Sequence, residues 1–207
     1  NEASSALLLT VNLLFGCILM CATFIDLEHM IIPDRLSVGG AVVGLILGFA
    51  FPSLLMGNLA FDGLLGSMAG GAYAGLGLLV GSGILYWVGV LAESILRREA
   101  IGQGDVKLLG CVGAFCGWKG AVFSIFGGAL LGTVLLLPLA ILHALSKDAS
   151  SKEKKNIGWG VEIPFGPFLA LAALLYQFGL NRLVDKEFEQ VVSLLQMAWS
   201  NGSSFGL

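Results

Sequence analysis

Long apolar runs alternate with short polar links along most of this chain. The first apolar run would form about 30 Å of helix, which matches the hydrocarbon thickness of a bilayer. The pattern therefore predicts an all-α integral membrane protein, with a six-span helical bundle at residues 1–182. The six runs cover residues 6–25, 36–56, 64–92, 106–118, 121–145 and 163–180.

The segment after the last run, residues 183–207, has a different pattern. Its apolar positions recur at the spacing of one helix face, and between them stand charged and amide side chains. Such a one-sided helix is typical of segments that lie at a membrane surface, so we predict an amphipathic interfacial helix and a tail. The apolar positions are Val184, Phe188, Val191, Val192, Leu195 and Trp199.

The third run is unusually rich in glycine, and many of its glycines are separated by three residues. Small residues at that spacing let helix backbones approach closely in lipid. We therefore expect this span to pack tightly against its neighbours. The glycines are Gly66, Gly70, Gly71, Gly75, Gly77, Gly81 and Gly83.

The fourth run, residues 106–118, is too short to cross a bilayer as it stands. It gives only about 20 Å of helix. It can span only if Asp105 and Lys107, at its start, lie below the membrane surface. We expect this acidic turn to be drawn into the protein.

Composition supports the membrane assignment and excludes several classes of protein. Hydrophobic residues make up 57% of the chain and charged residues only 12%, whereas an ordinary soluble domain has about 25% charged residues. The mean hydropathy is +0.90. A net charge of -3, spread over the links, argues against nucleic acid as a partner and against a basic surface-binding module.

The four cysteines lie inside apolar runs and not in polar links. No Cys-x-x-Cys pair occurs, and no His or carboxylate stands beside Cys17 and Cys21 on their helix face. We therefore expect no metal site, and we interpret all four cysteines, including Cys111 and Cys116, as small buried hydrophobic residues.

The basic residues indicate which way the spans run. The links after the first, third and fifth runs hold eight of the 11 lysines and arginines, and the opposite side holds three. Basic links remain in the cytoplasm, so both ends of the chain would lie outside. Asp26 and Asp105 would then both lie at the cytoplasmic edge of the membrane.

Asp26 and Asp105 are candidates for a catalytic pair. A charged carboxylate at bilayer depth costs about 2.5 kcal/mol or more, so such groups usually face a protein interior or a wet cavity. Two carboxyl groups brought together there share a proton, which is the state that aspartic proteolysis needs. Gly102 and Gly104 would give an extended substrate room to approach Asp105. Asp105 as a helix cap, and Asp26 as a charge that ends a span, remain open as alternatives.

Two further links have defined backbone requirements. Pro33 disfavours helix at the residue before it, and Asp34 is placed to cap the next helix. Pro164, Gly166 and Pro167 form a stiff, bent entry to the sixth span.

Three segments together resemble signature blocks of the type IV prepilin peptidases, which belong to the Gly-x-Gly-Asp membrane aspartic proteases. The segments are FIDLEHMIIPDRL at 24–36, GQGDVKL at 102–108 and IPFGP at 163–167. The resemblance extends over most of the chain, from about residue 23 to residue 180. Any one block alone would be a weak signal, but the three in this order are specific.

The resemblance implies a peptidase that needs no cofactor and whose catalytic residues are Asp26 and Asp105. Its substrates would be type IV prepilins and type II secretion pseudopilins, cut after a short basic leader at the cytoplasmic face of the bacterial inner membrane. Glu28 would lie near the bound leader, and Lys107 would orient charge near Asp105. The remaining site-shaping residues would be Gly102, Gly104, Pro164 and Gly166.

One part of the family pattern has no counterpart in this sequence. Many bacterial members carry an upstream zinc-binding cytoplasmic domain and N-methylate the new N-terminus. Because the chain starts at Asn1 without a methionine, we expect it to be part of a longer protein. N-methyltransferase activity is not supported by these residues.

Two other functions are compatible with the same residues, and the sequence leaves the oligomeric state open. A proton-coupled transporter or channel would use the two acids as a relay. A non-catalytic assembly protein would not need them.

Overall fold

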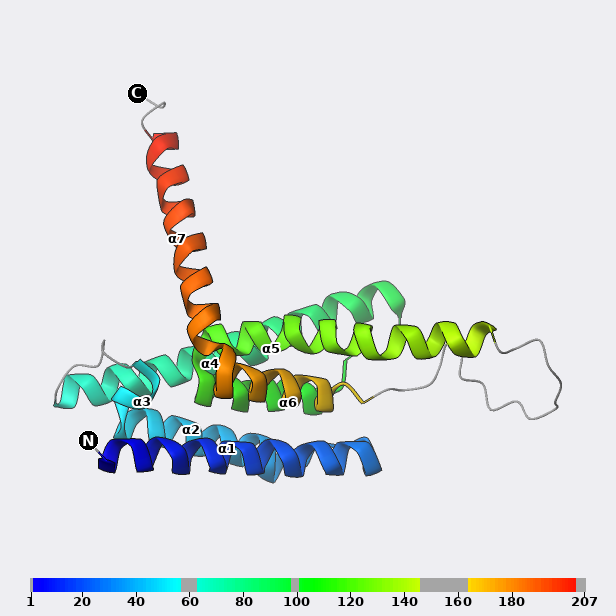
Figure 1. The fold of residues 1–207 in the computed structure, drawn as a ribbon, viewed down its shortest axis with the longest axis horizontal. Coiled ribbons are helices and arrows are strands. Elements are labelled where there is room, and N and C mark those ends of the chain that lie inside the picture. Colours follow the sequence, from blue (N-terminus) through cyan, green and yellow to red (C-terminus); the bar gives the residue numbers. More distant parts are fainter. Residues whose placement is uncertain (1, 57–62, 98–100, 146–163, 204–207) are drawn as a thin grey trace.

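The structure of the protein, a computed structural model, describes residues 2–56, 63–97, 101–145 and 164–203 (Figure 1). Within these ranges every regular element is a helix. The elements in chain order are α1 (Glu2–His29), α2 (Asp34–Ala50), α3 (Pro52–Met56), α4 (Leu64–Leu96), α5 (Gln103–Leu145), α6 (Gly166–Leu175), η3 (Tyr176–Leu180) and α7 (Asn181–Ser203).

The apolar helices lie roughly along one common axis, as a membrane bundle requires (Figure 1). Three stretches of described helix are long and apolar enough to cross a bilayer: Ser5–His29, Leu64–Leu96 and Gln103–Pro138. The stretch Gly166–Leu180 is a shorter apolar helix, and α2 has 17 residues. The predicted all-α membrane fold is confirmed, and each of the six apolar runs corresponds to a helical segment.

Helix α1 continues beyond the point where its apolar run ends. We expected Asp26 to begin a polar link, but the helix extends to His29 and ends at Met30, whose φ is +52°. The amide of Met30 donates to the Asp26 carbonyl at 2.8 Å. Asp26 therefore has helical geometry, which fixes the direction of its side chain.

The second predicted span is divided by a proline. Helix α2 ends at Ala50, and Pro52 begins the separate short helix α3. Proline lacks an amide hydrogen and its ring clashes with the preceding turn, so it kinks or breaks a helix, and here α2 ends before it. The prediction of one continuous helix over residues 36–56 was wrong for this reason.

The glycines of α4 form the predicted close-packing stripe, although not all of them take part. Gly70, Gly77 and Gly81 are buried, and a Cβ on Gly77 would collide with the carbonyl of Gly113 in α5. Gly83 has nothing within 4 Å of its Cβ position. Only the face of α4 that points into the bundle needs small residues.

Helix α5 is broken sharply at Gly117, whose φ of 70° and ψ of 179° are not helical. A single residue of α4, Gly81, contacts both Leu109 and Ala121 on the two sides of the break. In a straight helix those two residues would lie about 18 Å apart. The chain therefore turns back at Gly117, and residues 103–116 and 118–145 form two separate helical segments. We expected the link between them near Lys119, which is instead helical.

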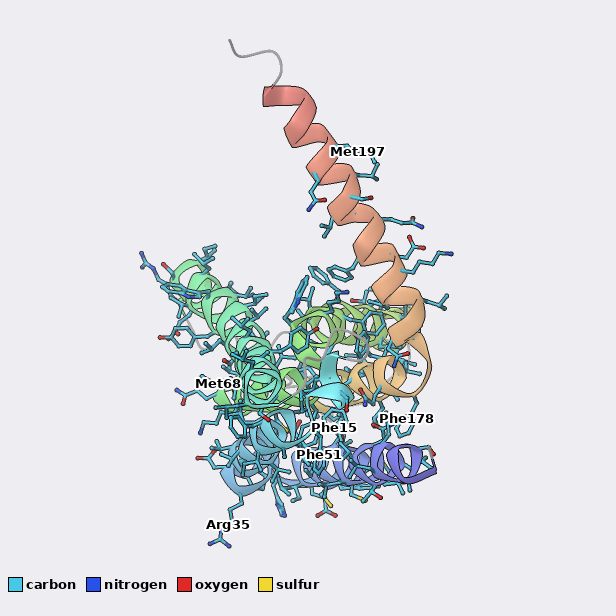
Figure 2. The ribbon with its side chains drawn as sticks, turned by 90° about the vertical axis from the view of Figure 1, so that its left-hand side faces the viewer. Phe15, Arg35, Phe51, Met68, Phe178 and Met197 are labelled. Carbon is cyan, nitrogen blue, oxygen red and sulfur yellow. The ribbon has the colours of Figure 1, made fainter. Side chains whose placement is uncertain are left out.

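The core forms where α1, α5 and α6 meet. Phe15 points from α1 into the bundle (Figure 2) and stacks on Phe115 with ring centroids 4.8 Å apart. Cys111 and Cys116 are buried, as predicted, but Cys17 and Cys21 are exposed. The prediction failed for these two because they lie on the opposite face of α1 from Phe15, where the helix has no protein neighbour.

Helix α7 stands at a steep angle to the bundle axis (Figures 1 and 2). It is joined to the bundle through the π-helical turn η3, and Phe188 packs edge-on against Trp118 with ring centroids 5.5 Å apart. The predicted helix is present. Its position at a membrane surface remains a prediction.

Candidate active site

Asp26 is one of the few buried acidic side chains of the described residues. It is 6% exposed and lies on the same face of α1 as Phe15, Leu19 and Ala22, all of which are fully buried. Their spacings of four, three and four residues follow the helical repeat. The face of α1 that builds the core therefore also carries Asp26 inward at its last turn.

Asp105 is the second buried acid and lies in the first turn of α5. Its amide donates to the Gly102 carbonyl at 3.1 Å, and its side chain is 9% exposed. A Cβ on Gly102 would lie 3.6 Å from Asp105 Oδ2. Asp105 is therefore buried, as predicted, whereas Gly102 and Gln103 of the same turn are exposed. A role for Asp105 as the residue that caps α5 is not supported, because Asp105 lies inside the helix.

The tertiary structure brings these two acids together from distant parts of the sequence. The carboxyl group of Asp26 lies close enough to that of Asp105 for the two charges to repel each other. Both groups are shielded from solvent, and charges interact more strongly in such surroundings than in water. The site therefore contains two buried carboxyl groups whose charges would interact.

Gly166 brings the third sequence block to Asp26. The backbone amide of Gly166 faces the Asp26 carboxyl group, and a Cβ on Gly166 would lie only 2.5 Å from Asp26 Oδ2. Among the described residues, no group completes a hydrogen bond with Oδ2, which is buried. A buried polar atom without a partner is costly in a fold and marks a candidate functional group.

Ile32 is a site residue that sequence reasoning did not single out. It is 6% exposed, and its Cβ lies 3.1 Å from the Cβ position of Gly104. Its Cδ1 lies 3.1 Å from the Cβ position of Gly166. Nothing in the sequence indicated that Ile32 lies between Gly104 and Gly166, because an isoleucine that follows Ile31 and precedes Pro33 has no special pattern.

Lys107 forms an ion pair with Asp34 and not with the catalytic candidates. Its Nζ lies 2.6 Å from Asp34 Oδ1, so the start of α5 is joined to the start of α2. We predicted that Asp34 would cap α2, and this was wrong. Pro33 occupies the N-cap position with no side-chain cap, and Asp34 is the first helical residue, with its carboxylate turned to Lys107.

The remaining predicted residues lie around this centre. Glu28 is on the exposed last turn of α1, 3.8 Å from His29. Pro164 is half-buried, two residues before Gly166. No group of three or more His, Cys, Asp or Glu side chains suited to a metal ion occurs in the described part of the chain. The expectation of a metal-free site stays a prediction.

The fold and the site define an all-helical membrane protein with a buried, interacting pair of aspartates. Comparison with known proteins agrees with this class. The profile of the type IV leader peptidase family matches residues 13–137. The chain belongs to this family.

Several curated relatives carry the name prepilin leader peptidase/N-methyltransferase. The chain is 32% identical over 177 residues to the protein of Xanthomonas campestris pv. campestris, covering 84% of this chain and 51% of the relative. It is 32% identical over 175 residues to that of Aeromonas hydrophila, covering 82% and 50%. It is 29% identical over 182 residues to that of Legionella pneumophila, covering 85% and 53%. The chain thus spans about half the length of these relatives. No solved structure matches it.

Proposed function

We propose that this chain is a membrane aspartic endopeptidase that removes the short basic leader from type IV prepilins and type II secretion pseudopilins. The observation that carries the proposal is the burial of both Asp26 and Asp105 in one site, where Ile32 contacts both Gly104, beside Asp105, and Gly166, beside Asp26. One carboxylate takes a proton from the attacking water, and the other, protonated, donates to the scissile carbonyl. The carboxyl group that received the proton of the water then protonates the leaving amine, and the other carboxylate takes a proton from a hydroxyl group of the tetrahedral intermediate, so the C–N bond breaks and both aspartates return to their starting states.

The site offers separate places for the two parts of such a substrate. The basic leader binds near the acidic side chain of Glu28, which is exposed two residues after Asp26. The apolar helix that follows the leader lies in the membrane beside the enzyme's own spans. Opposite charges attract the leader at the surface, and Gly102 and Gly104 leave space for its extended backbone.

In this proposal the protein lies in the bacterial inner membrane, and its cleavage site is at the cytoplasmic face. The distribution of basic residues supports that orientation, because the links on the side of Asp26 and Asp105 carry most of them. The relatives are also named for N-methyl transfer, and the proposal does not extend to that activity.

Residues 1–182 form the peptidase bundle in this proposal, and residues 183–207 form the interfacial segment. The steep angle of α7 to the spans supports this division, since a helix perpendicular to the bundle axis runs parallel to the membrane (Figure 1). Nitroxide labels in vesicles test it. A label at Val191 should be accessible to oxygen in the lipid, and one at Lys186, on the opposite face of the helix, to a water-soluble relaxation agent. Equal exposure of both labels to water would exclude an interfacial α7.

The catalytic proposal is tested with the purified full chain, a prepilin and its pseudopilin counterpart. Asp26→Asn and Asp105→Asn keep the side-chain size but cannot take both protonation states, so each should abolish cleavage. Glu93→Gln, on the exposed last turn of α4, is the matched control and should cleave normally. Retained cleavage by either Asn variant would remove that aspartate from catalysis.

The transporter alternative is tested in the same preparation after reconstitution into liposomes. Proton or solute flux that depends on the two acids, without peptide cleavage by the wild type, would replace the peptidase proposal. An assembly role without catalysis predicts that both Asn variants behave as the wild type does in every assay.

A further inference from the structure

Ile32 lies where the three residue blocks of the site meet. Its side chain runs along Gly104, where the Cβ position is 3.1 Å from Ile32 Cβ, 3.4 Å from Cγ1 and 3.5 Å from Cδ1. The far end of the same side chain, Cδ1, touches the Cβ position of Gly166 at 3.1 Å. One apolar side chain therefore separates the turn that carries Asp105 from the backbone that faces Asp26.

The local sequence fixes this side chain in place. Pro33 follows Ile32 and holds its backbone extended between α1 and α2. The carbonyl of Pro33 in turn accepts the Leu36 amide at 3.0 Å and the Ser37 amide at 3.2 Å, which anchors the start of α2. The backbone at Ile32 is therefore tied to the start of α2.

We propose that Ile32 is a positioning residue that sets the separation of the two catalytic carboxyl groups and keeps water from one side of Asp26. The inference rests on the proposed peptidase function, and it assigns Ile32 no contact with the substrate. Asp26 Oδ2 and Ile32 Cδ1 both lie against Gly166, at 2.5 and 3.1 Å from its Cβ position. The unpartnered oxygen and the end of the Ile32 side chain thus border the same position at Gly166.

The two glycines differ in a way that makes the inference testable. A methyl group on Gly104 meets Ile32 first, whereas one on Gly166 meets Asp26 Oδ2 first and Ile32 second. Shortening Ile32 to valine keeps Cβ, the atom nearest to Gly104, but removes Cδ1, and the smaller side chain can move away from Gly104 into the space that Cδ1 leaves beside Gly166. It cannot relieve the contact between a Gly166 methyl group and the Asp26 carboxyl group.

The experiment is a pair of double-mutant cycles in the purified full chain, with kcat, KM and the thermal midpoint measured for each variant. Gly104→Ala should lower kcat about tenfold with little change in KM, since displacements well below 1 Å at reacting groups already slow catalysis. Adding Ile32→Val should restore several-fold of that loss and raise the thermal midpoint of the Gly104→Ala protein. Gly166→Ala should lose at least as much activity and gain nothing from Ile32→Val.

Ile31→Val is the matched control, because Ile31 is the neighbouring residue of the same type and is 66% exposed. It should leave both glycine variants unchanged. If Ile32→Val rescues neither glycine variant, or rescues both equally, Ile32 does not position the pair and the inference is overturned. If the wild type cleaves no prepilin, the proposed function itself fails, an outcome distinct from an active wild type without the asymmetric rescue.

Discussion

The ammonium group of Lys107 lies 2.6 Å from Oδ1 of Asp34, and this ion pair joins two helices that begin beside the aspartate pair. The two side chains are 39% and 67% exposed, so solvent screens the pair and it contributes no more than about 1 kcal/mol to stability. Its effect is geometric. It holds the turn of Asp105 against the segment that follows Asp26.

Loss of this ion pair should reduce catalysis more than stability. We expect Lys107→Met to lower kcat about tenfold through misplacement of Asp105, with a nearly unchanged thermal midpoint. The reversed pair, Asp34→Lys with Lys107→Asp, should recover part of the activity that either single reversal loses. Lys119→Met, the same substitution near the opposite end of residues 103–116, is the control and should be active. Failure of the reversed pair to exceed both single variants would exclude a positioning role.

The stripe of small residues in α4 predicts opposite outcomes for two glycines of one helix. Gly77→Ala should destabilise the bundle by about 1–3 kcal/mol, because its methyl group would be forced into the Gly113 backbone. Gly83→Ala has open space and should be neutral or stabilise by up to about 1 kcal/mol through helix propensity. Thermal unfolding in detergent measures both. Equal thermal midpoints for the Gly77→Ala and Gly83→Ala proteins would contradict close packing of α4 against α5 at Gly77.

The reversal of α5 depends on a conformation that only glycine adopts readily. Gly117 has φ of 70° with ψ of 179°, and a Cβ there would lie 2.5 Å from the ring of Tyr73. Gly117→Ala should destabilise the protein by about 1–3 kcal/mol from backbone strain alone. Tyr73→Ala should not restore the Gly117→Ala protein, since strain remains after the contact is removed. Full restoration of the stability of Gly117→Ala by Tyr73→Ala would show that the ring contact, and not the backbone, makes glycine necessary. The control for the unfolding measurements is Gly39→Ala, at a helical glycine whose Cβ position has no atom within 4 Å.

A hydrogen-bonded chain of polar side chains crosses the bundle away from the aspartates. Gln177 Nε2 donates to Asn12 Oδ1 at 2.7 Å, and Cys116 Sγ donates to Gln177 Oε1 at 3.3 Å. Asn12→Leu should destabilise by about 1–3 kcal/mol because it leaves a polar group of Gln177 unpaired. The double variant with Gln177→Leu should cost less than the sum of the single variants. If the destabilisation of the double variant in thermal unfolding equals the sum for the two single variants, the pairing of Asn12 with Gln177 is contradicted.

The linear sequence determined the class of protein and identified the candidate reactive groups. Apolar runs of membrane length predict helices, because a chain in lipid must satisfy its own backbone hydrogen bonds. Acids inside so apolar a chain stand out as costly, and this points to Asp26 and Asp105 before any contact is known. Local rules also located the stiff entry at Gly166.

The tertiary structure alone decided what surrounds each acid. That Asp34 pairs with Lys107, and does not cap its helix, depends on a contact across 73 residues. Ile32 became a site residue only once folding placed Gly104 and Gly166 on its two sides. The return of the chain at Gly117 likewise depends on its packing against α4. Local pattern fixes which residues become helical or buried, whereas partners from distant segments are chosen by packing that no short stretch of sequence encodes.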